Sequence, residues 1–447
     1  MKNFFESLAN VWKIEELKNR ILITLGLLLV YRFGAHVTLP GIDATQLNSL
    51  AGQTKNGIGS ILDMFTGGAF SKASVFALGI MPYISASIVV QLMGIAIPYL
   101  QKLQKDGESG RKKLNQITRW LTILITLVQG PGYIYNLYQT LPSSAFMLGF
   151  DSFSFLFSSV LILTTGTVFA MWMGEKITDK GIGNGISLLI MVGILARLPQ
   201  AFIQEFSSTI TNNNGGPMLL VIEIIIWLLV IIACVLLVMA VRKIPVQYAR
   251  RTTTGDFEED MMCGNRQWIP LKLNASGVMP IIFAQAIMFI PAALAGLSQS
   301  ETSQSIAGAF SNMFGLWYNL VFATLIVVFT FFYTAITVPT NKMADDLKRS
   351  GGFIPGIRPG AETSDYLDHI MSLITFPGSL FLALIAVFPA IIVSLGVQQS
   401  WALFFGGTSL IIMVGVAIDT IQQINSYLLN KHYDGLMKSG KNRKAVA

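Results

Sequence analysis

Long apolar blocks, separated by short polar stretches, set the pattern of this chain. Each block is long enough to cross the roughly 30 Å hydrocarbon layer of a membrane, which takes about 20 residues of α-helix. We therefore predict ten spanning helices, at residues 21–39, 74–97, 120–141, 153–173, 185–203, 218–241, 277–297, 316–337, 370–396 and 401–424. Composition agrees, because only 12% of the 447 residues are charged, whereas a soluble domain carries about 25%. The pattern predicts an all-α membrane protein.

The basic residues predict the orientation of these helices. If the N-terminus is cytosolic, 27 of the 31 Lys and Arg fall on inside segments. Those segments are residues 1–20, 99–119, 175–183, 242–274, 338–369 and 425–447. This is the positive-inside rule, so we expect both termini to be cytosolic. The four exceptions are Arg32, Lys55, Lys72 and Arg197. Because the net charge of +7 follows membrane topology, it does not indicate direct DNA binding.

The predicted spans divide into two groups of five. We expect a cytosolic segment at 1–20, without a cleavable signal peptide, and a cytosolic tail at 425–447. Between them lie an N-terminal half at 21–203, an external hinge at 204–217 and a C-terminal half at 218–424. With an odd number of spans in each half, the two halves have opposite topologies. This arrangement is compatible with an inverted repeat, whose interface is the usual place for a transport pathway.

Residues 55–73 (KNGIGSILDMFTGGAFSKA) fit neither a span nor a plain loop. The stretch is too polar to face lipid, yet it contains six large apolar side chains. Irregular backbone at membrane depth is tolerated only where it is buried in protein or lines a cavity. Two interpretations stay open here, a re-entrant stopper within a pore and an amphipathic helix on the outer surface.

Two of the inside loops are long and strongly polar. Residues 242–274 begin RKIPVQYARR and continue through an acidic GDFEED. Residues 338–369 contain GGFIPGIRPG, whose glycines and prolines predict a rigid, non-helical tip. Loops of this length are usually functional or disordered. Their basic residues favour a docking surface for a cytosolic partner over simple topology anchors.

The sequence offers little chemistry for catalysis, so we predict no catalytic residue, metal site or cofactor. The three histidines, His36, His369 and His432, lack metal-ligand spacing. The run GIGNG at 181–185 has no preceding strand, so we interpret it as a tight helix-entry turn rather than a phosphate loop. Cys234 and Cys263 are expected to be two unpaired side chains.

A secondary transporter is the competing class of function. Transporters mark their route with buried ionisable residues, and the candidates here are Arg32, Glu223 and Asp419. All three are predicted near span ends, where long side chains reach the interface. Isoleucines are instead abundant in the second and fifth spans, and an apolar constriction can gate a pore without charge. This feature favours a channel for large cargo.

Six blocks of sequence resemble the SecY family of protein-translocation channel subunits. They are ALGIMPYISASIVVQLM at 77–93, KDGESGRKKLNQITRW at 105–120, GIGNGISLLI at 181–190, LKLNASGVMPIIFA at 271–284, GGFIPGIRPG at 351–360 and FFGGTSLIIMVGVAID at 404–419. The resemblance implies ten helices in two inverted halves around a central pore, with a re-entrant plug helix and a lateral gate between the second and seventh helices. It also implies export of unfolded proteins across, and insertion of membrane proteins into, a bacterial inner membrane.

The same resemblance implies roles for individual residues. The pore ring would comprise Ile80, Ile84, Ile186, Ile190, Ile282 and Ile412. The plug, at about 57–67, would present Ile58, Ile61, Leu62, Met64 and Phe65. Gln91 and Gln285 would lie at the lateral gate, and Arg250, Arg251 and Arg358 would contact a motor or ribosome. The i, i+4 spacing of 80/84 and 186/190 independently places each pair on one helix face.

Partners follow from the resemblance as well. They are the SecE and SecG subunits, the SecA motor, the ribosome, YidC, membrane lipid and unfolded polypeptides that carry a signal sequence. Because the chain itself has no means of hydrolysing a nucleotide, the energy for transport would come from such a partner or from the membrane potential.

Overall fold

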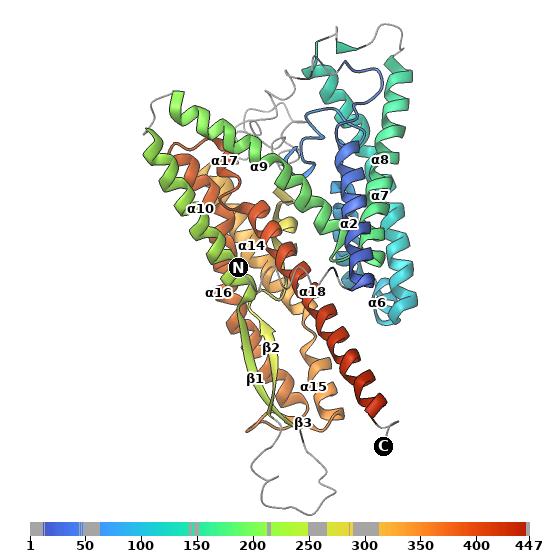
Figure 1. The fold of residues 1–447 in the computed structure, drawn as a ribbon, viewed down its shortest axis with the longest axis vertical. Coiled ribbons are helices and arrows are strands. Elements are labelled where there is room, and N and C mark those ends of the chain that lie inside the picture. The colour runs from blue at the N-terminus through green and yellow to red at the C-terminus, as the bar shows by residue number, and fades with distance from the viewer. Residues whose placement is uncertain are drawn as a thin grey trace, which may run out of the picture. The chain divides into compact units, whose positions relative to one another are not determined.

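A computed structural model describes residues 14–43, 63–142, 152–211, 216–248, 266–285 and 313–443, with isolated positions at 12, 45, 47, 145–146 and 287–288. Its helices are α2 (Glu15–Gly34), α5 (Met81–Ala96), α6 (Pro98–Lys105), α7 (Gly107–Thr140), α8 (Ser152–Lys180), α9 (Gly185–Thr211), α10 (Gly216–Met239), α14 (Leu316–Thr337), α15 (Thr340–Arg349), α16 (Ala361–Ser394), α17 (Gln399–Ala402) and α18 (Gly407–Arg443). Its strands are β1 (Val241–Tyr248), β2 (Arg266–Lys272) and β3 (Gly352–Phe353) (Figure 1).

Helical structure overlaps every predicted span within the described residues. For the block at 277–297, the described part is helical at 279–285 and 287–288. Among the described helices, six are long and apolar enough to cross a membrane, and the bent pair α5 and α6 can supply a seventh. α2 and α7 occupy the first and third predicted spans and carry more polar residues. The prediction of an all-α membrane protein is confirmed.

The second predicted span begins later than its apolar block. We expected a helix over 74–97, but residues 66–80 form successive turns and α5 begins at Met81. Gly67, Gly68 and Gly79 have φ of +65°, +91° and +53°, values that suit glycine and end a right-handed helix. Pro82 then lies in the first turn of α5, where its missing N–H is not needed.

The predicted hinge at 204–217 is also shorter than expected. α9 continues without a break to Thr211 and α10 begins at Gly216, so the first eight residues of the hinge are helical. Pro199 lies inside α9 and does not end it. One boundary between two compact units falls between Ser208 and Thr209, but Gln399–Trp401 and Val416–Ala447 belong to the first unit, so the division into the halves 21–203 and 218–424 stays a prediction.

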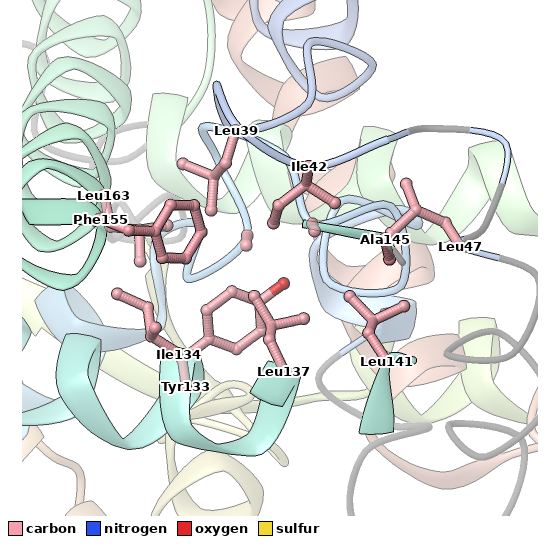
Figure 2. Close-up of a cluster of buried hydrophobic side chains, with 12 residues drawn as sticks. Leu39, Ile42, Leu47, Tyr133, Ile134, Leu137, Leu141, Ala145, Phe155 and Leu163 are labelled. Atoms are coloured by element: carbon pink, nitrogen blue, oxygen red, sulfur yellow. The ribbon is translucent and has the colours of Figure 1, made fainter. Parts of the chain in front are cut away.

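Unit 1 comprises Met1–Ser208, Gln399–Trp401 and Val416–Ala447. One of its cores joins α7 and α8 to the chain that follows α2 (Figure 2). Tyr133, Ile134 and Leu137 of α7 pack there with Phe155 and Leu163 of α8. The other members are Leu39, Ile42, Leu47, Ala73, Ala77, Leu141 and Ala145. This core holds irregular backbone on both sides of the region that is not described, at 39–47 and at 73–77.

Unit 2 comprises Thr209–Gln398 and Ala402–Gly415, so α18 contributes its first residues to this unit and the remainder to unit 1. Helices α14 and α16 pack together, and the two long polar loops meet in an antiparallel sheet with strand order β2-β1-β3 (Figure 1). The register pairs Ile244 of β1 with Ile269 of β2, and Gln247 with Phe353 of β3.

This sheet is not among the elements predicted from the sequence. The buried Ile244 and Val246 alternate with more exposed neighbours, the period that a half-buried strand requires. Residues 242–274 were predicted only as a long polar loop. Residues 351–360 are non-helical, as predicted, and two of them form strand β3.

Candidate functional site

The segment Asp63–Ser71 is buried inside unit 1. Met64 and Phe65 are 9% and 8% exposed, and Thr66 is 2% exposed. A methyl group added at Gly193 of α9 would lie 2.5 Å from the carbonyl oxygen of Phe65. One added at Gly67 would lie 2.8 Å from the Cα atom of Gly193. The backbones can approach this closely because Gly193 and Gly67 carry no Cβ atom, so α9 forms a seat for this segment.

Charged side chains bind the same segment from two helices. Arg32 of α2 donates from Nη1 to the carbonyl oxygen of Gly67 at 2.7 Å. Arg197 of α9 forms an ion pair with Asp63 through Nη2 and also donates to Ser71 Oγ at 2.8 Å. Asp63 Oδ1 accepts from the backbone N–H of Ser71 at 2.8 Å. The carboxylate therefore closes a loop within the segment and fixes that loop to α9.

The C-terminal end of this segment is hydrogen-bonded to the core shown in Figure 2. Tyr133 donates from its hydroxyl to the carbonyl oxygen of Phe70 at 2.8 Å. The backbone N–H of Leu39 donates to Ala73 at 2.8 Å, and that of Val75 donates to Val37 at 2.9 Å. The ring of Phe76 stacks on Tyr31 of α2, with centroids 5.5 Å apart. Residues 63–76 are thus held by protein on several sides, which supports a buried element over a helix on the outer surface.

Four of the six predicted ring isoleucines belong to unit 1. Ile80 is 4% exposed and accepts a backbone hydrogen bond from Ile84 at 3.1 Å, one helical turn away. Ile190 is 6% exposed, and Ile186 is partly buried near the start of α9. Ile282 and Ile412 belong to unit 2, where Ile412 is 3% exposed. That all six meet at one constriction stays a prediction.

The GIGNG run positions the start of α9. The backbone N–H of Ile182 donates to Thr24 Oγ1 of α2 at 3.1 Å, and that of Gly183 donates to Gln423 Oε1 of α18 at 2.8 Å. Asn184 Oδ1 accepts from the backbone N–H of Ile186 at 3.2 Å and caps the helix. Gly183 has φ of +80°. These contacts make the run a tight helix entry, as predicted, and they orient Ile186 and Ile190.

The two predicted lateral-gate residues lie in different units. Gln91 of α5 is partly buried and donates to Ser87 Oγ at 3.2 Å. Gln285 is 5% exposed, at the end of the helical stretch 279–285. The structure therefore places both residues on helical elements, and their pairing across a gate stays a prediction.

Arg358 lies at the tip of the 351–360 loop, and its side chain is 88% exposed. Its carbonyl oxygen accepts from Thr363 Oγ1 at 2.8 Å, which fixes the backbone while leaving the guanidinium group in solvent. Glu362 approaches only to 3.9 Å. The predicted docking residues Arg250 and Arg251, and the plug residues Ile58, Ile61 and Leu62, lie outside the described residues.

A hydrophobic core supports this tip within unit 2. Its buried members are Ile244, Val246, Leu271, Leu347, Ile354, Leu367 and Met371, from the sheet, α15, the loop and α16. We call this assembly of sheet, α15 and 351–360 loop the loop platform. It presents Arg358 on a packed base rather than on a free chain.

Asp63 was missed as a functional candidate, and Arg197 was noted only for its place outside the cytosolic segments. The sequence did contain a signal for this ion pair, because Arg197 lies outside the predicted cytosolic segments. A basic residue in such a place needs a local reason. No group of three or more potential metal ligands occurs among the described residues. Cys234 is free and buried.

These features define a class of protein, a multi-pass helical membrane protein with an irregular segment buried inside one helical unit. A solved structure described as that of a protein conducting channel has the same fold, with a TM-score of 0.60 and 17% identity over 92% of both chains. Sec61 from a canine ribosome–channel complex gives a TM-score of 0.55 and 16% identity over 92% of both chains. At such low identity these likenesses concern the fold alone.

Sequence comparison identifies the family. The family model SecY matches residues 74–421. The chain is 38% identical to the protein translocase subunit SecY of Aquifex aeolicus over 435 residues, 97% of this chain and 99% of that protein. It is 40% identical to the protein of the same name from Haemophilus influenzae, over 95% of this chain and 94% of that protein. The chain belongs to the SecY family.

Proposed function

We propose that this protein is the pore subunit of a protein-conducting channel in a bacterial inner membrane. It exports unfolded secretory proteins and inserts membrane proteins, and it catalyses no reaction itself. The observation that carries the proposal is the segment 63–71, a short helical stretch at 63–65 followed by turns, which is buried against α2 and α9. Irregular backbone of this kind persists at membrane depth only inside protein or along a pathway.

Residues 63–67 are the described part of the proposed plug, about 57–67, and residues 68–71 continue the same buried segment. Met64 and Phe65 are its described apolar side chains. The proposed apolar ring consists of Ile80, Ile84, Ile186, Ile190, Ile282 and Ile412. Branched apolar side chains close around an extended polypeptide and exclude hydrated ions, because a dewetted constriction conducts poorly.

Lateral exit to lipid takes place between α5 and the helix that contains Gln285. An apolar cargo segment partitions sideways where lipid is the better solvent, with about 0.3–0.6 kcal/mol gained for each Leu-like residue. Gln91 and Gln285 contribute polar contacts at this seam. The two five-helix halves, separated near 204–217, form an inverted repeat around the pathway.

Cytosolic partners supply the energy. The loop platform, with Arg250, Arg251 and Arg358, docks the SecA motor or a ribosome, and SecE and SecG complete the channel, with YidC as a further partner in insertion. The 88% exposure of the Arg358 side chain supports this role, because its ion pair with Glu362, at 3.9 Å, is long and leaves the charge available to an acidic partner. Both termini are cytosolic.

One reconstitution tests the function. The purified chain is placed in liposomes with SecE, SecA and ATP, and protection of a secretory precursor from added protease is measured. We expect ATP-dependent protection. Movement of a small solute without SecA, and no protected precursor, would assign the protein to the carriers instead.

Substitution of the ring isoleucines tests the gate in the same liposomes. Burying one such side chain is favourable by about 1.5–3 kcal/mol, so Ile282→Asn or Ile412→Asn should raise the open fraction about tenfold or more. Ions should then leak without cargo, and precursors with defective signal sequences should be exported. Ile225→Asn on α10, where Ile225 is 58% exposed, is the control. Equal leak from Ile225→Asn would mean general destabilisation and would remove the ring assignment.

Orientation is tested by thiol labelling in intact cells. A cysteine at Glu362, beside the loop tip, should resist an impermeant reagent added outside, whereas Ser143→Cys in the expected outside loop should react. Labelling of Glu362→Cys from outside would reject the proposed topology.

A further inference from the structure

Three of the four basic residues that lie off the predicted cytosolic segments lie on or beside the segment 63–71, and one of them, Arg197, pairs with the Asp63 carboxylate. Arg32 and Arg197 contact the segment 63–71 directly, and Lys72 follows it in the chain. The charge of Arg32 acts on both Lys72 and Arg197, each of which is partly removed from water. Cations on this side of the membrane are disfavoured by the positive-inside rule, so their clustering calls for a local function.

Asp63 supplies the opposing charge. Its side chain is 12% exposed and that of Arg197 is 27% exposed, and the two form an ion pair. Asp63 Oδ1 also accepts from Ser71 N–H, so the carboxylate is satisfied by both neighbours. In a site so poorly hydrated, removal of one partner costs far more than the net stability of the pair, because the other charge stays buried.

We infer that Asp63 is an electrostatic pin that holds the proposed plug segment on α9. Arg197 and Arg32 are its positioning partners. The inference rests on the proposed function, of which it specifies the control. With Asp63 charged, its ion pair with Arg197 holds the segment on α9, while Arg32 of α2 holds the carbonyl group of Gly67. With Asp63 neutral, Arg32, Lys72 and Arg197 repel one another, and the segment leaves the Gly193 seat.

This arrangement predicts a non-additive response. Asp63→Asn keeps the size of the side chain and leaves Arg197 without its anion, so passive ion leak should rise about tenfold or more. Arg197→Gln leaves the buried Asp63 carboxylate without its ion-pair partner, so its leak should rise as well. The double variant Asp63→Asn/Arg197→Gln should leak less than Asp63→Asn alone, because removal of Arg197 relieves the repulsion.

Glu175→Gln and Arg119→Gln are the matched controls. Arg119 and Glu175 form a fork-like ion pair between α7 and α8 in the same unit, at 2.9 and 2.5 Å. That pair does not contact the segment 63–71 in the described hydrogen bonds, so breaking it should not raise the leak. Leak from Glu175→Gln equal to that from Asp63→Asn would overturn the pin, and so would a double variant that leaks at least as much as Asp63→Asn.

A labelling measurement keeps this test independent of conduction. Thr66 is 2% exposed, so in a chain without its native cysteines Thr66→Cys should react slowly with a small thiol reagent. Adding Asp63→Asn should accelerate the reaction at least several-fold, and adding Glu175→Gln should not. If Ile282→Asn leaks while Asp63→Asn neither leaks nor exposes Thr66→Cys, the pin is wrong and the channel stands. If Asp63→Asn accelerates labelling of Thr66→Cys while Ile282→Asn shows no ion leak, the role of Asp63 is supported and the proposed ring is wrong.

Discussion

Residues 63–76 and residues 351–360 are both glycine-rich, irregular stretches in a helical protein, and they are held in opposite ways. The first is buried, and its carbonyl groups accept from Arg32 and Tyr133 while Asp63 pairs with Arg197. The second leaves Arg358 in solvent, while its backbone pairs with β1 and accepts from Thr363. Backbone that is shielded from water must find its partners in protein, whereas backbone at a water-exposed tip needs only a firm base.

The two regions therefore depend on different interactions. Close glycine contact and charge hold residues 63–71 on α9, so a change there should affect the closed state of the channel. A hydrophobic core holds the loop platform, so a change there should affect the engagement of a partner. Variants in one region should leave the property of the other region intact, and that separation can be tested.

The largest effect is expected from the core of the loop platform. Ile244 is 2% exposed, and a buried Ile→Ala substitution costs about 2–5 kcal/mol. Ile244→Ala should loosen the sheet, so limited proteolysis should cut 338–369 much faster and SecA-driven transport should fall. Passive ion leak should not change. Lys243→Ala, at the exposed neighbouring position of β1, is the control and should alter neither property. Leak from Ile244→Ala would mean that the platform also holds the pore closed.

A smaller effect is expected from charge reversal at the loop tip. Arg358→Glu changes an exposed side chain without disturbing the core beneath it, so folding and assembly should be normal. Hydrogen bonds to charged groups contribute about 1.5–3 kcal/mol each, which is enough to weaken binding of SecA about tenfold or more. Binding of SecA to reconstituted channels and ATP-dependent export measure this change. Lys342→Glu on α15, also exposed, should be milder, and unimpaired export by Arg358→Glu would remove Arg358 from the docking surface.

The smallest of the three effects is expected at the glycine seat. A methyl group at Gly193 would lie 2.5 Å from the carbonyl oxygen of Phe65, and such overpacking costs about 1–3 kcal/mol. Gly193→Ala should raise passive leak and leave SecA binding unchanged, which is the reverse of the pattern at Arg358. Gly26→Ala on α2, where nothing lies within 4 Å, is the control. If Gly193→Ala shows no increase in passive ion leak, the segment 63–71 can shift without opening the pore.

Several elements could be predicted from the sequence because their signals are local. The apolar blocks at 218–241 and 316–337 coincide closely with α10 and α14, since crossing a membrane requires a long apolar run. The tight entry at 181–185 and the non-helical tip at 351–360 follow from glycine and proline. The i, i+4 pair Ile80 and Ile84 lies one turn apart, as expected. In each case a few neighbouring residues suffice.

Other features depended on residues that are far apart in the chain. Nothing near Asp63 indicates Arg197, which is 134 positions away, and nothing in VRKIPVQY indicates that its partner strand lies beyond an acidic loop. The start of α5 was predicted too early because apolar composition cannot distinguish a helix from buried turns. The class of protein and most of its helical segments were determined by the sequence itself, because hydrophobicity acts residue by residue. The seat of the segment 63–71, its ion pair and the sheet beneath Arg358 were decided only by tertiary structure, because buried polar groups take whatever partner the fold brings within reach.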